Sequence, residues 1–476
     1  MSTPTTARGA LSRRFGTLLA AAALVAAPTA AVLSPSAAMA ASTDPTLVGA
    51  HYLQQQLAAG GHHFSVTFDG VDYPDHGVTA DAVLALAAAG TAQDEAALAT
   101  AWLAGDVVGY LGFGDPAEIS AGSAAKLLNV ALAQGIDPTD FGGYDLLTAL
   151  QGLEQPSGRF SDKSVYGDYT NTFGQSFALI GLDRAGEPVS DAARAYLLAQ
   201  QCPGGGFQLY MSDAGCTSDD SADPDATAMA VQALIAVGGA SAAAGDGLDY
   251  LASRQDLAGG VGGGGPQSGV NANSTGLAGQ AFLAGGRTAQ ARAAVMFLTS
   301  LQYGCDFPVA LRGGIAYDAA AFAATKADGA AAEPIDQDRR STSQALLALA
   351  GTPLASVTAD GADAVAPALT CTTPTPSTTT TVSATSTPTV STSASTTPRP
   401  STSTSSVTTT APGSSDPTGS GDDTTTGGGS DGSASGPTGS LAQTGSDLLI
   451  PVGLGIAFVV VGGVVVAATR RQGAHR

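Results

Sequence analysis

Two carboxylates separated by one residue, Asp223 and Asp225, precede an apolar, helix-like run in the stretch SADPDATAMAVQAL. Such a pair can donate and accept a proton if burial raises the pKa of one member. The same residues can also cap a helix, because an Asp side-chain oxygen accepts a backbone N–H of the first turn. The rest of the sequence has to decide between these two roles.

The arrangement around Asp223 recurs along the chain. Six Ala/Leu-rich segments align on one column that holds Thr79, Ala125, Thr172, Thr227, Thr275 and Thr342. Four positions earlier stand Asp75, Ala121, Asp168, Asp223, Asn271 and Asp338. Two positions earlier stand Gly77, Ser123, Thr170, Asp225, Asn273 and Arg340, most of them types favoured at helix N-caps. A cavity needs one proton donor, whereas every helix needs a cap. We therefore assign no catalytic residue and keep Asp223 and Asp225 only as weak candidates.

A second motif precedes several of these segments and has the form Gln/Glu-x-x-x-Gly-x-hydrophobe. It occurs as EQPSGRF, QCPGGGF and QDLAGGV, each after another apolar helical stretch. The repeating unit is thus helix, Gly-rich loop, helix, with a period of roughly 50 residues that is typical of helical-hairpin arrays. We predict an all-α domain of six hairpins over residues 42–371, in which the Gln side chains satisfy backbone groups at helix ends.

These degenerate squalene-cyclase-type repeats, with Asp-x-Asp-x-Thr-Ala before an inner helix, resemble the terpenoid cyclase and protein prenyltransferase superfamily. The vitamin B12 carriers of the transcobalamin type share its toroid. The resemblance implies an (α/α)6 toroid. It also places Asp223 and Asp225 on the first two acids of the cyclase motif, the second being the proton donor, but Ala226 replaces the third acid.

The activities of that superfamily fit this chain poorly. Aromatic residues, which stabilise carbocations in cyclases, make up 5% of the sequence. The Asp-x-Cys of the prenyltransferase zinc site has no match, and no domain that could clasp cobalamin follows the predicted toroid. We therefore expect no cofactor of these kinds.

In a toroid, the six loops before the inner helices lie at one end of the barrel. The acids that would surround this mouth are Asp75, Asp168, Asp213, Asp219, Asp220, Asp223, Asp225 and Asp338. They could bind Ca²⁺, or a cationic or hydroxyl-rich ligand, but a solvated acidic rim is the simpler expectation. The long fourth loop, with Tyr210 and Met211, is the strongest candidate for a recognition surface.

The four cysteines, Cys202, Cys216, Cys305 and Cys371, indicate disulfides in an exported protein. Three connectivities are possible, and we favour the pairs Cys202–Cys216 and Cys305–Cys371. A metal site is the alternative, but no Cys-x-x-Cys spacing and no nearby histidine support it.

Both ends of the chain indicate export. Residues 1–40 combine early arginines, an apolar run and Ala-Met-Ala, as in a secretory signal peptide. Residues 372–440 are rich in Ser, Thr, Pro and Gly and predict a disordered stalk. In residues 441–476, a five-residue motif precedes an apolar span over 448–468 and a basic tail; the motif is Leu441, Ala442, Gln443, Thr444 and Gly445.

This order of motif, span and basic tail resembles a sortase sorting signal of Gram-positive bacteria. The resemblance implies cleavage between Thr444 and Gly445 and transfer of Thr444 to a peptidoglycan amine. Sortase and a peptidoglycan precursor would then be partners, and the membrane would be crossed only before sorting. The net charge of −21 disfavours a nucleic-acid partner.

The sequence thus predicts a wall-anchored surface protein that displays a non-catalytic toroid for ligand binding or adhesion. The alternative is an extracellular glycan hydrolase or lyase on the same scaffold, which needs paired carboxylates or a Tyr/His set inside the barrel. The nearest candidates for that alternative are Glu154, Tyr166, Asp168 and Tyr169.

Overall fold

The structure, a computed structural model, describes residues 41–265 and 268–371. The predicted signal peptide (1–40), stalk (372–440) and sorting signal (441–476) lie outside these residues. Within the described ranges, no helix is both long enough and apolar enough to cross a bilayer.

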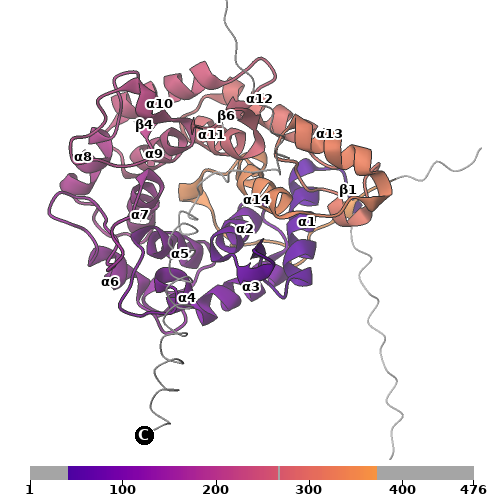
Figure 1. Cartoon of the computed structure of the whole chain (residues 1–476), viewed down its shortest axis with the longest axis horizontal. Coiled ribbons are helices and arrows are strands. Elements are labelled where there is room, and N and C mark those ends of the chain that lie inside the picture. Colours follow the sequence, from indigo (N-terminus) through magenta and orange to yellow (C-terminus); the bar gives the residue numbers. More distant parts are fainter. Residues whose placement is uncertain (1–40, 266–267, 372–476) are drawn as a thin grey trace, which may run out of the picture. The chain divides into compact units, whose positions relative to one another are not determined.

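Six helices form an inner ring. They are α2 (His76–Ala89), α5 (Ala121–Ala133), α7 (Thr172–Arg184), α9 (Pro224–Val237), α11 (Ala272–Ala284) and α14 (Asp336–Ala350). Each helix packs against the next, and α14 packs against α2, so that the ring is closed (Figure 1). Their sequences are rich in Ala and buried at nearly every position of the first three turns, as expected for helices covered on all sides.

An outer helix precedes each inner one and packs around the ring (Figure 1). The outer helices are α1 (Pro45–Ala59), α3 (Gln93–Gly105), α6 (Leu146–Gln151), α8 (Asp191–Ala199), α10 (Ser241–Arg254) and α12 (Thr288–Ser300). Two further helices, α4 (Val107–Gly112) and α13 (Ala319–Asp328), lie in the second and sixth loops. The described residues therefore form the ring of helical hairpins that the repeats predict.

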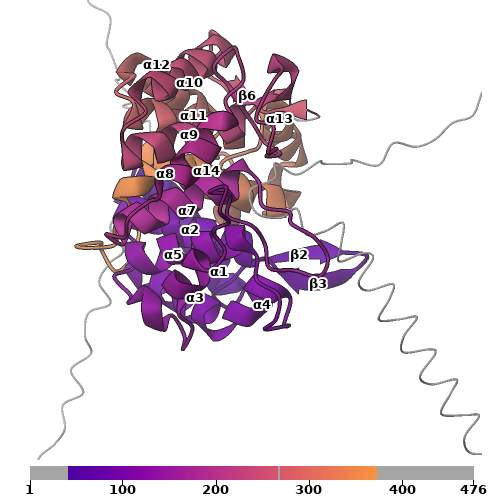
Figure 2. The same cartoon turned by 90° about the vertical axis from the view of Figure 1, so that its left-hand side faces the viewer.

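Short strands and 3₁₀ turns, which the repeats do not predict, occupy the loops. The antiparallel pairs are β2 (Ser65–Phe68) with β3 (Val71–Pro74), β4 (Phe207–Gln208) with β5 (Ala222–Asp223), and β6 (Val261–Gly262) with β7 (Val270–Asn271). Strand β1 (Ala41–Ser42) pairs in parallel with β8 (Ala368–Leu369). The β2–β3 hairpin projects from the ring (Figure 2). The 3₁₀ turns are η1 (Pro138–Asp140), η2 (Asp219–Ser221), η4 (Val309–Leu311), η5 (Gly329–Ala331) and η6 (Leu354–Ser356).

In four of the six units, the repeated threonine joins the Gly-rich loop to its inner helix. Thr227 Oγ1 donates to the carbonyl of Asp223 at 2.6 Å and accepts the N–H of Phe207 at 2.8 Å. Because Phe207 is the hydrophobe of the QCPGGGF motif, one hydroxyl fixes both motifs relative to each other. Equivalent pairs of bonds are made by Thr79, Thr275 and Thr342.

The glutamine of the Gly-rich motif joins neighbouring hairpins. Gln201 Nε2 donates to the carbonyls of Gly205, at 2.9 Å, and of Ala243 in the first turn of α10, at 2.8 Å. In the sixth unit, Gln302 Nε2 donates to the carbonyl of Pro45, the first residue of α1, at 2.8 Å. The same contact that joins consecutive units therefore also joins the last unit to the first and helps to close the ring.

Residues 354–366, named here the closing segment, cross the end of the ring formed by the C-termini of the inner helices. The N–H of Leu354 donates to Gln232 Oε1 of α9 at 3.1 Å. Arg184 at the end of α7 donates to the carbonyls of Leu354 and Val357 at 3.4 and 2.6 Å. Burial lowers the pKa of Arg184 to about 10. The closing segment thus shuts this end of the ring and inserts Leu354 toward its centre.

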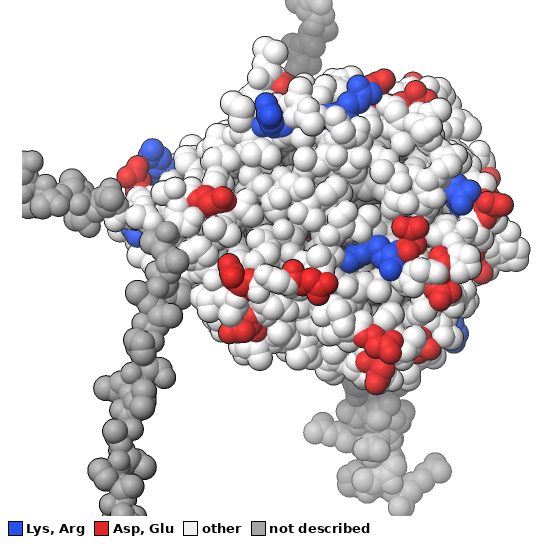
Figure 3. All heavy atoms as spheres, turned by 180° about the vertical axis from the view of Figure 1, so that it is seen from behind, with Lys and Arg blue, Asp and Glu red and all other residues white. Residues whose placement is uncertain are grey.

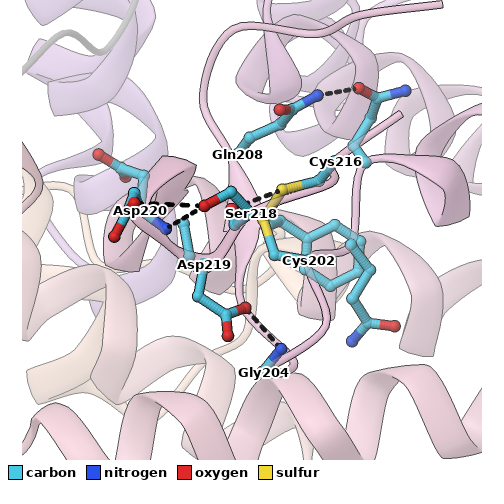
Figure 4. The surroundings of a disulfide bond; sticks show 12 residues. Cys202, Gly204, Gln208, Cys216, Ser218, Asp219 and Asp220 are labelled. Atoms are coloured by element: carbon cyan, nitrogen blue, oxygen red, sulfur yellow. Dashed lines mark hydrogen bonds between the residues drawn. A yellow bond between two sulfur atoms is a disulfide. The ribbon is translucent and has the colours of Figure 1, made fainter. Parts of the chain in front are cut away.

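Both predicted disulfides are present. Cys202 is bonded to Cys216 across the fourth loop (Figure 4), and Cys305 is bonded to Cys371. The first bond closes the loop that contains Tyr210. The second ties the loop after α12 to the last described residue, so that the end of the domain is covalently held to the ring.

Candidate functional site

The centre of the ring is almost filled. Its cavity has a volume of about 40 Å³ and is lined mainly by Phe177, Met229, Leu277, Leu347 and Leu354. This is room for a few water molecules, well below the roughly 300 Å³ at which small-molecule pockets begin. The described ring therefore has no central chamber of the size that a glycan or terpenoid would need.

A buried ion pair lies at the edge of this cavity. Lys126 Nζ of α5 donates to Asp81 Oδ1 of α2 at 2.8 Å, and both side chains are largely withdrawn from solvent. Burial alone would lower the pKa of Lys126, but the charge and hydrogen bond of Asp81, together with Tyr110 and Asp75, outweigh burial and raise that pKa. Lys126 also lies 5.4 Å from the ring centre of Phe177. The pair is an internal link between two inner helices.

Asp223 and Asp225 have different roles. Asp223 is the N-cap of α9, and its Oδ1 accepts the N–H of Ala226 at 2.8 Å. Asp225 is inside the first turn, is 7% exposed, and its Oδ1 has no hydrogen-bond partner in the described chain. Burial and then the charge of Asp223 raise the pKa of Asp225 to about 7. The predicted capping role therefore holds for Asp223 and fails for Asp225.

Only some of the other inner helices are capped by the residue in the aligned column that contains Asp223. Asp75 and Asn271 cap α2 and α11 from the position equivalent to Asp223. Ser120 and Asn171 cap α5 and α7 from other positions. The column that contains Asp225 caps no inner helix, so the recurrence of polar residues there has another cause.

The remaining mouth acids do not converge on one point. Asp75 and Asp338 are buried: Asp75 Oδ2 accepts Arg340 Nη2 at 2.8 Å, and Asp338 Oδ1 accepts the Tyr303 hydroxyl at 2.8 Å. Burial, opposed by hydrogen bonds from Ile335 and Tyr303, raises the pKa of Asp338 to about 6.

Asp219 and Asp220 are engaged locally in the fourth loop. Asp219 Oδ1 accepts the N–H of Gly204 at 2.6 Å, and Asp220 Oδ2 accepts the Ser218 hydroxyl at 3.3 Å (Figure 4). No group of three or more His, Cys, Asp or Glu side chains in residues 41–265 and 268–371 is arranged to hold a metal ion. The eight acids therefore do not form the shared Ca²⁺ site that the sequence allowed.

An open polar cleft lies instead between the loops that precede α7 and α9. It has a volume of about 400 Å³. We name it the rim cleft, and it is lined by Gln155, Ser157, Arg159, Ser161, Asp168, Met211 and Asp213. The two loops are joined where the N–H of Thr172 donates to the carbonyl of Leu209 at 3.0 Å. The cleft brings together Asp168, Met211 and Asp213, which the sequence analysis had singled out separately.

Arg159 organises the rim cleft. Its Nε donates to Asp168 Oδ2 at 2.7 Å, and its Nη1 donates to the Tyr196 hydroxyl at 3.1 Å. Tyr196 donates in turn to Asp213 Oδ1 at 3.0 Å, so that one network links both carboxylates. Burial opposes the ionisation of Asp168, but hydrogen bonds from Arg159 and from the N–H groups of Asp162 and Thr170 lower its pKa overall.

The sequence analysis missed Arg159 and Tyr196, although one signal pointed to the arginine. Arg159 is the residue before the hydrophobe in EQPSGRF, where QCPGGGF and QDLAGGV have Gly206 and Gly260. A glycine there approaches its neighbours closely, since a Cβ on Gly206 would lie 2.8 Å from the Tyr250 ring. An arginine at this position therefore indicated that the third loop is built differently. Tyr196 belongs to an ordinary amphipathic helix and gave no such signal.

Three exposed tyrosines stand beside the lining residues in sequence. Tyr166 is 68% exposed and Tyr169 is 48% exposed, on the loop that carries Asp168. Tyr210, which precedes Met211, is 66% exposed. Such rings offer flat apolar surface together with a hydroxyl. Glu154, the fourth candidate of the enzymatic alternative, accepts a hydrogen bond from Ser190 at the start of α8 and does not line the cleft.

The surface around the ring is sparsely charged. On the face shown in Figure 3, acidic side chains occur in several separate groups and the few basic ones mostly lie beside acids. This distribution agrees with the low content of Lys and Arg and offers no extended basic patch on that face.

No family model matches the sequence, and no curated protein matches it. Among solved structures, the type II terpene cyclase MstE from Scytonema is 14% identical, with 64% of this chain and 96% of that chain covered and a TM-score of 0.46. The unsaturated glucuronyl hydrolase from Bacillus sp. GL1 is 12% identical, with 64% and 95% covered and a TM-score of 0.45.

Haptocorrin in complex with Cbi is 14% identical, with 66% of this chain and 68% of that chain covered and a TM-score of 0.40. Two of these three neighbours are enzymes and one is a binding protein. Their identities and scores are low, so the ring architecture described above rests on the helix contacts of this chain and no activity follows from the similarity.

Proposed function

We propose that the protein is exported, attached covalently to the cell wall, and displays its helical ring as a non-catalytic module that binds a glycan in the rim cleft. The observation that carries the binding role is the rim cleft itself, an open volume of about 400 Å³ lined by hydroxyl, amide, carboxylate and guanidinium groups. Hydroxyl-rich ligands are held by such groups together with exposed aromatic faces.

Binding is favoured over hydrolysis by the state of the two cleft carboxylates. A glycosidase needs one carboxyl group with a raised pKa as general acid and a second as base or nucleophile. The pKa of Asp168 is lowered through its bond to Arg159, and Asp213 is tied to the Tyr196 hydroxyl. The central cavity, with its volume of about 40 Å³, offers no alternative chamber for a sugar ring.

Export and wall attachment are supported by the predicted signal peptide, stalk and sorting signal. Two disulfides among four cysteines, with no free cysteine in the described chain, suit an oxidising compartment. In this proposal the stalk carries the ring away from the wall, and sortase and the peptidoglycan precursor are the partners of attachment.

Replacing Thr444 by alanine should abolish wall attachment, because Thr444 supplies the carbonyl that sortase transfers. We expect the variant to leave the fraction released by peptidoglycan hydrolases and to appear in the membrane fraction, as followed by immunoblotting. Ser446→Ala, two residues on, is the matched control and should remain in the wall. A Thr444→Ala protein that is still covalently bound to peptidoglycan would show that the sorting assignment is wrong.

Replacing Tyr210 by alanine should weaken glycan binding about tenfold, as is typical when an aromatic anchor is removed from a binding surface. Affinity would be measured by calorimetry with oligosaccharides selected on a glycan array. Phe68→Ala removes a 44% exposed ring from the β2–β3 hairpin, outside the lining of the rim cleft, and should leave binding unchanged. If Tyr210→Ala and Phe68→Ala bind alike, the rim cleft is not the binding site.

A further inference from the structure

We propose that the glycan held in the rim cleft is a cationic one, whose sugars carry free amino groups that pair with Asp213. This inference rests on the proposed function, because it names the ligand class of the same cleft. Three independent features of the described residues support it. They are the hydrogen bonds of Arg159 (the one cation among the lining residues), the charges of the fourth loop, and the exposed tyrosine rings.

Four of the five N–H groups of the single cation that lines the cleft are engaged. Arg159 Nε donates to Asp168, Nη1 donates to Tyr196 and to the carbonyl of Met211 at 3.4 Å, and Nη2 donates to the carbonyl of Thr170 at 3.1 Å. A carboxylate, sulfate or phosphate on a ligand would therefore find one N–H on Nη2 and could not form a bidentate pair with the guanidinium without breaking these bonds. The hydrogen bonding of Arg159 therefore disfavours the binding of anionic glycans in the cleft.

The carboxylates of the cleft are not equally engaged. Asp168 accepts Arg159 through Oδ2 and the N–H groups of Asp162 and Thr170 through Oδ1. Asp213 is exposed and accepts only Tyr196, through Oδ1, leaving its Oδ2 without a partner in the described chain. With one guanidinium and two carboxylates among the lining residues, the net charge of the cleft is −1. Asp213 is thus the acceptor that the protein leaves for a ligand.

The loop that carries Asp213 strengthens this preference. No Lys or Arg occurs between Gln201 and Ser253, whereas Asp219 and Asp220 follow Asp213 within the same loop. A surface with charges of one sign raises the local concentration of ligands of the opposite sign. A ligand amine approaching this side of the ring therefore meets a negative potential.

Exposed tyrosines suit an amino sugar in particular. The face of Tyr210 or Tyr169 can pack on the apolar face of a pyranose ring and attract a nearby ammonium group by a cation–π interaction. A neutral sugar gains only the first of these contacts, and an anionic sugar is repelled by the face of the ring. A cation that has no flat sugar surface gains only the second of these contacts.

The test compares four probes on the purified full-length chain by calorimetry at low salt and mildly acidic pH. The probes are a glucosamine oligomer, its N-acetylated counterpart, a uronate oligomer of equal length and an oligolysine. We expect the glucosamine oligomer to bind about tenfold more tightly than the N-acetylated one, as for one hydrogen bond to a charged partner. The uronate oligomer should show no binding.

Asp213→Asn should reduce this preference to within about twofold, because the amide keeps the shape and loses the charge. The matched control is Asp191→Asn on α8, an equal change of net charge at a carboxylate whose side chain is 98% exposed and outside the cleft. The control should keep the tenfold preference. If both variants change it equally, the overall charge is responsible and the assignment to Asp213 is overturned.

The remaining outcomes separate this inference from the proposed function. Equal or tighter binding of the N-acetylated oligomer overturns the amine preference and leaves a glycan-binding cleft in place. If none of the sugar oligomers binds, the proposed function itself fails. If oligolysine binds as tightly as the glucosamine oligomer and Tyr210→Ala affects neither, the cleft attracts cations without recognising sugar, and the inference is overturned.

Discussion

Replacing Lys126 by methionine should lower the free energy of unfolding by about 3–5 kcal/mol, the usual cost of removing one partner from a buried ion pair. The carboxylate of Asp81 would remain between α2 and α5 without its cation, and its Oδ2 already lacks a partner in the described chain. Methionine preserves most of the volume, so that the loss reports on charge more than on packing.

Chemical denaturation of the disulfide-intact protein measures this effect. Lys326→Met removes an exposed lysine from α13 and should change the free energy of unfolding by less than about 0.5 kcal/mol. The double variant Asp81→Leu with Lys126→Met should recover most of the stability, since both charges are then gone. A single Lys126→Met variant as stable as the parent would mean that the two side chains do not form a buried pair.

The ring of hairpins could be predicted because its determinants repeat. Four units carry a threonine that fixes their own Gly-rich loop, and three carry a glutamine that reaches the next hairpin, so that repeated residues make repeated contacts. The contact from Gln302 to Pro45 shows that even closure of the ring uses the repeated residue. Disulfide pairing followed from the same arrangement, because Cys202 and Cys216 flank a single loop.

The closing segment could not be predicted, because its contacts do not repeat. It crosses the ends of several inner helices and is held by Arg184 and Gln232. The fifth unit has the same residue types at the equivalent positions, Arg287 and Gln280, but these donate to Asp249 and to the carbonyl of Gln344. Nothing in the sequence of residues 354–366 distinguishes a plug from an ordinary tail. Whether the centre of the ring is open or filled therefore depended on the three-dimensional structure.

The rim cleft was predicted in part, for a related reason. Its recognition loop was expected from length, disulfide and aromatic content, but the network around Arg159 joins residues from the third loop, α8 and the fourth loop. This network is made by residues that differ from one repeat to the next, whereas an alignment of repeats reveals the residues that the repeats share. The departure at Arg159 was visible, but its meaning required the position of Tyr196 on α8.

The position of Asp225 inside the helix also had a sequence signal. Pro224 is favoured at the first position of a helix, which makes Asp223 the cap and puts Asp225 within the first turn. From there Asp225 lies one helical turn before Met229, which lines the central cavity. The repeats were aligned on Thr227, which follows both acids, and both acids then stood in columns of expected helix caps. This alignment hid the difference between them. The result is a carboxyl group, one helical turn from a residue of the central cavity, whose ionisation is opposed by burial.

Replacing Asp225 by asparagine should stabilise the protein at neutral and higher pH and have little effect near pH 4. The pKa of Asp225 is about 7 in the folded chain against 3.8 for a free side chain, so between these values the folded state holds a proton that the unfolded state has lost. Stability from this group is complete below about pH 4 and is lost as the pH rises toward 7. The shift corresponds to on the order of 4 kcal/mol, because each pKa unit is worth about 1.4 kcal/mol.

Asparagine mimics the protonated acid and cannot ionise, so the variant should lack this fall in stability. The free energy of unfolding, measured by denaturation at a series of pH values, should be similar for parent and variant near pH 4, diverge as the pH rises to about 7, and differ by a constant amount above that. Asp246→Asn, at an exposed carboxylate on α10, should keep the pH dependence of the parent. Parallel curves for Asp225→Asn and the parent would mean that Asp225 is ionised in the folded protein at acidic pH, and hence that water or a neighbouring donor reaches its Oδ1 in solution.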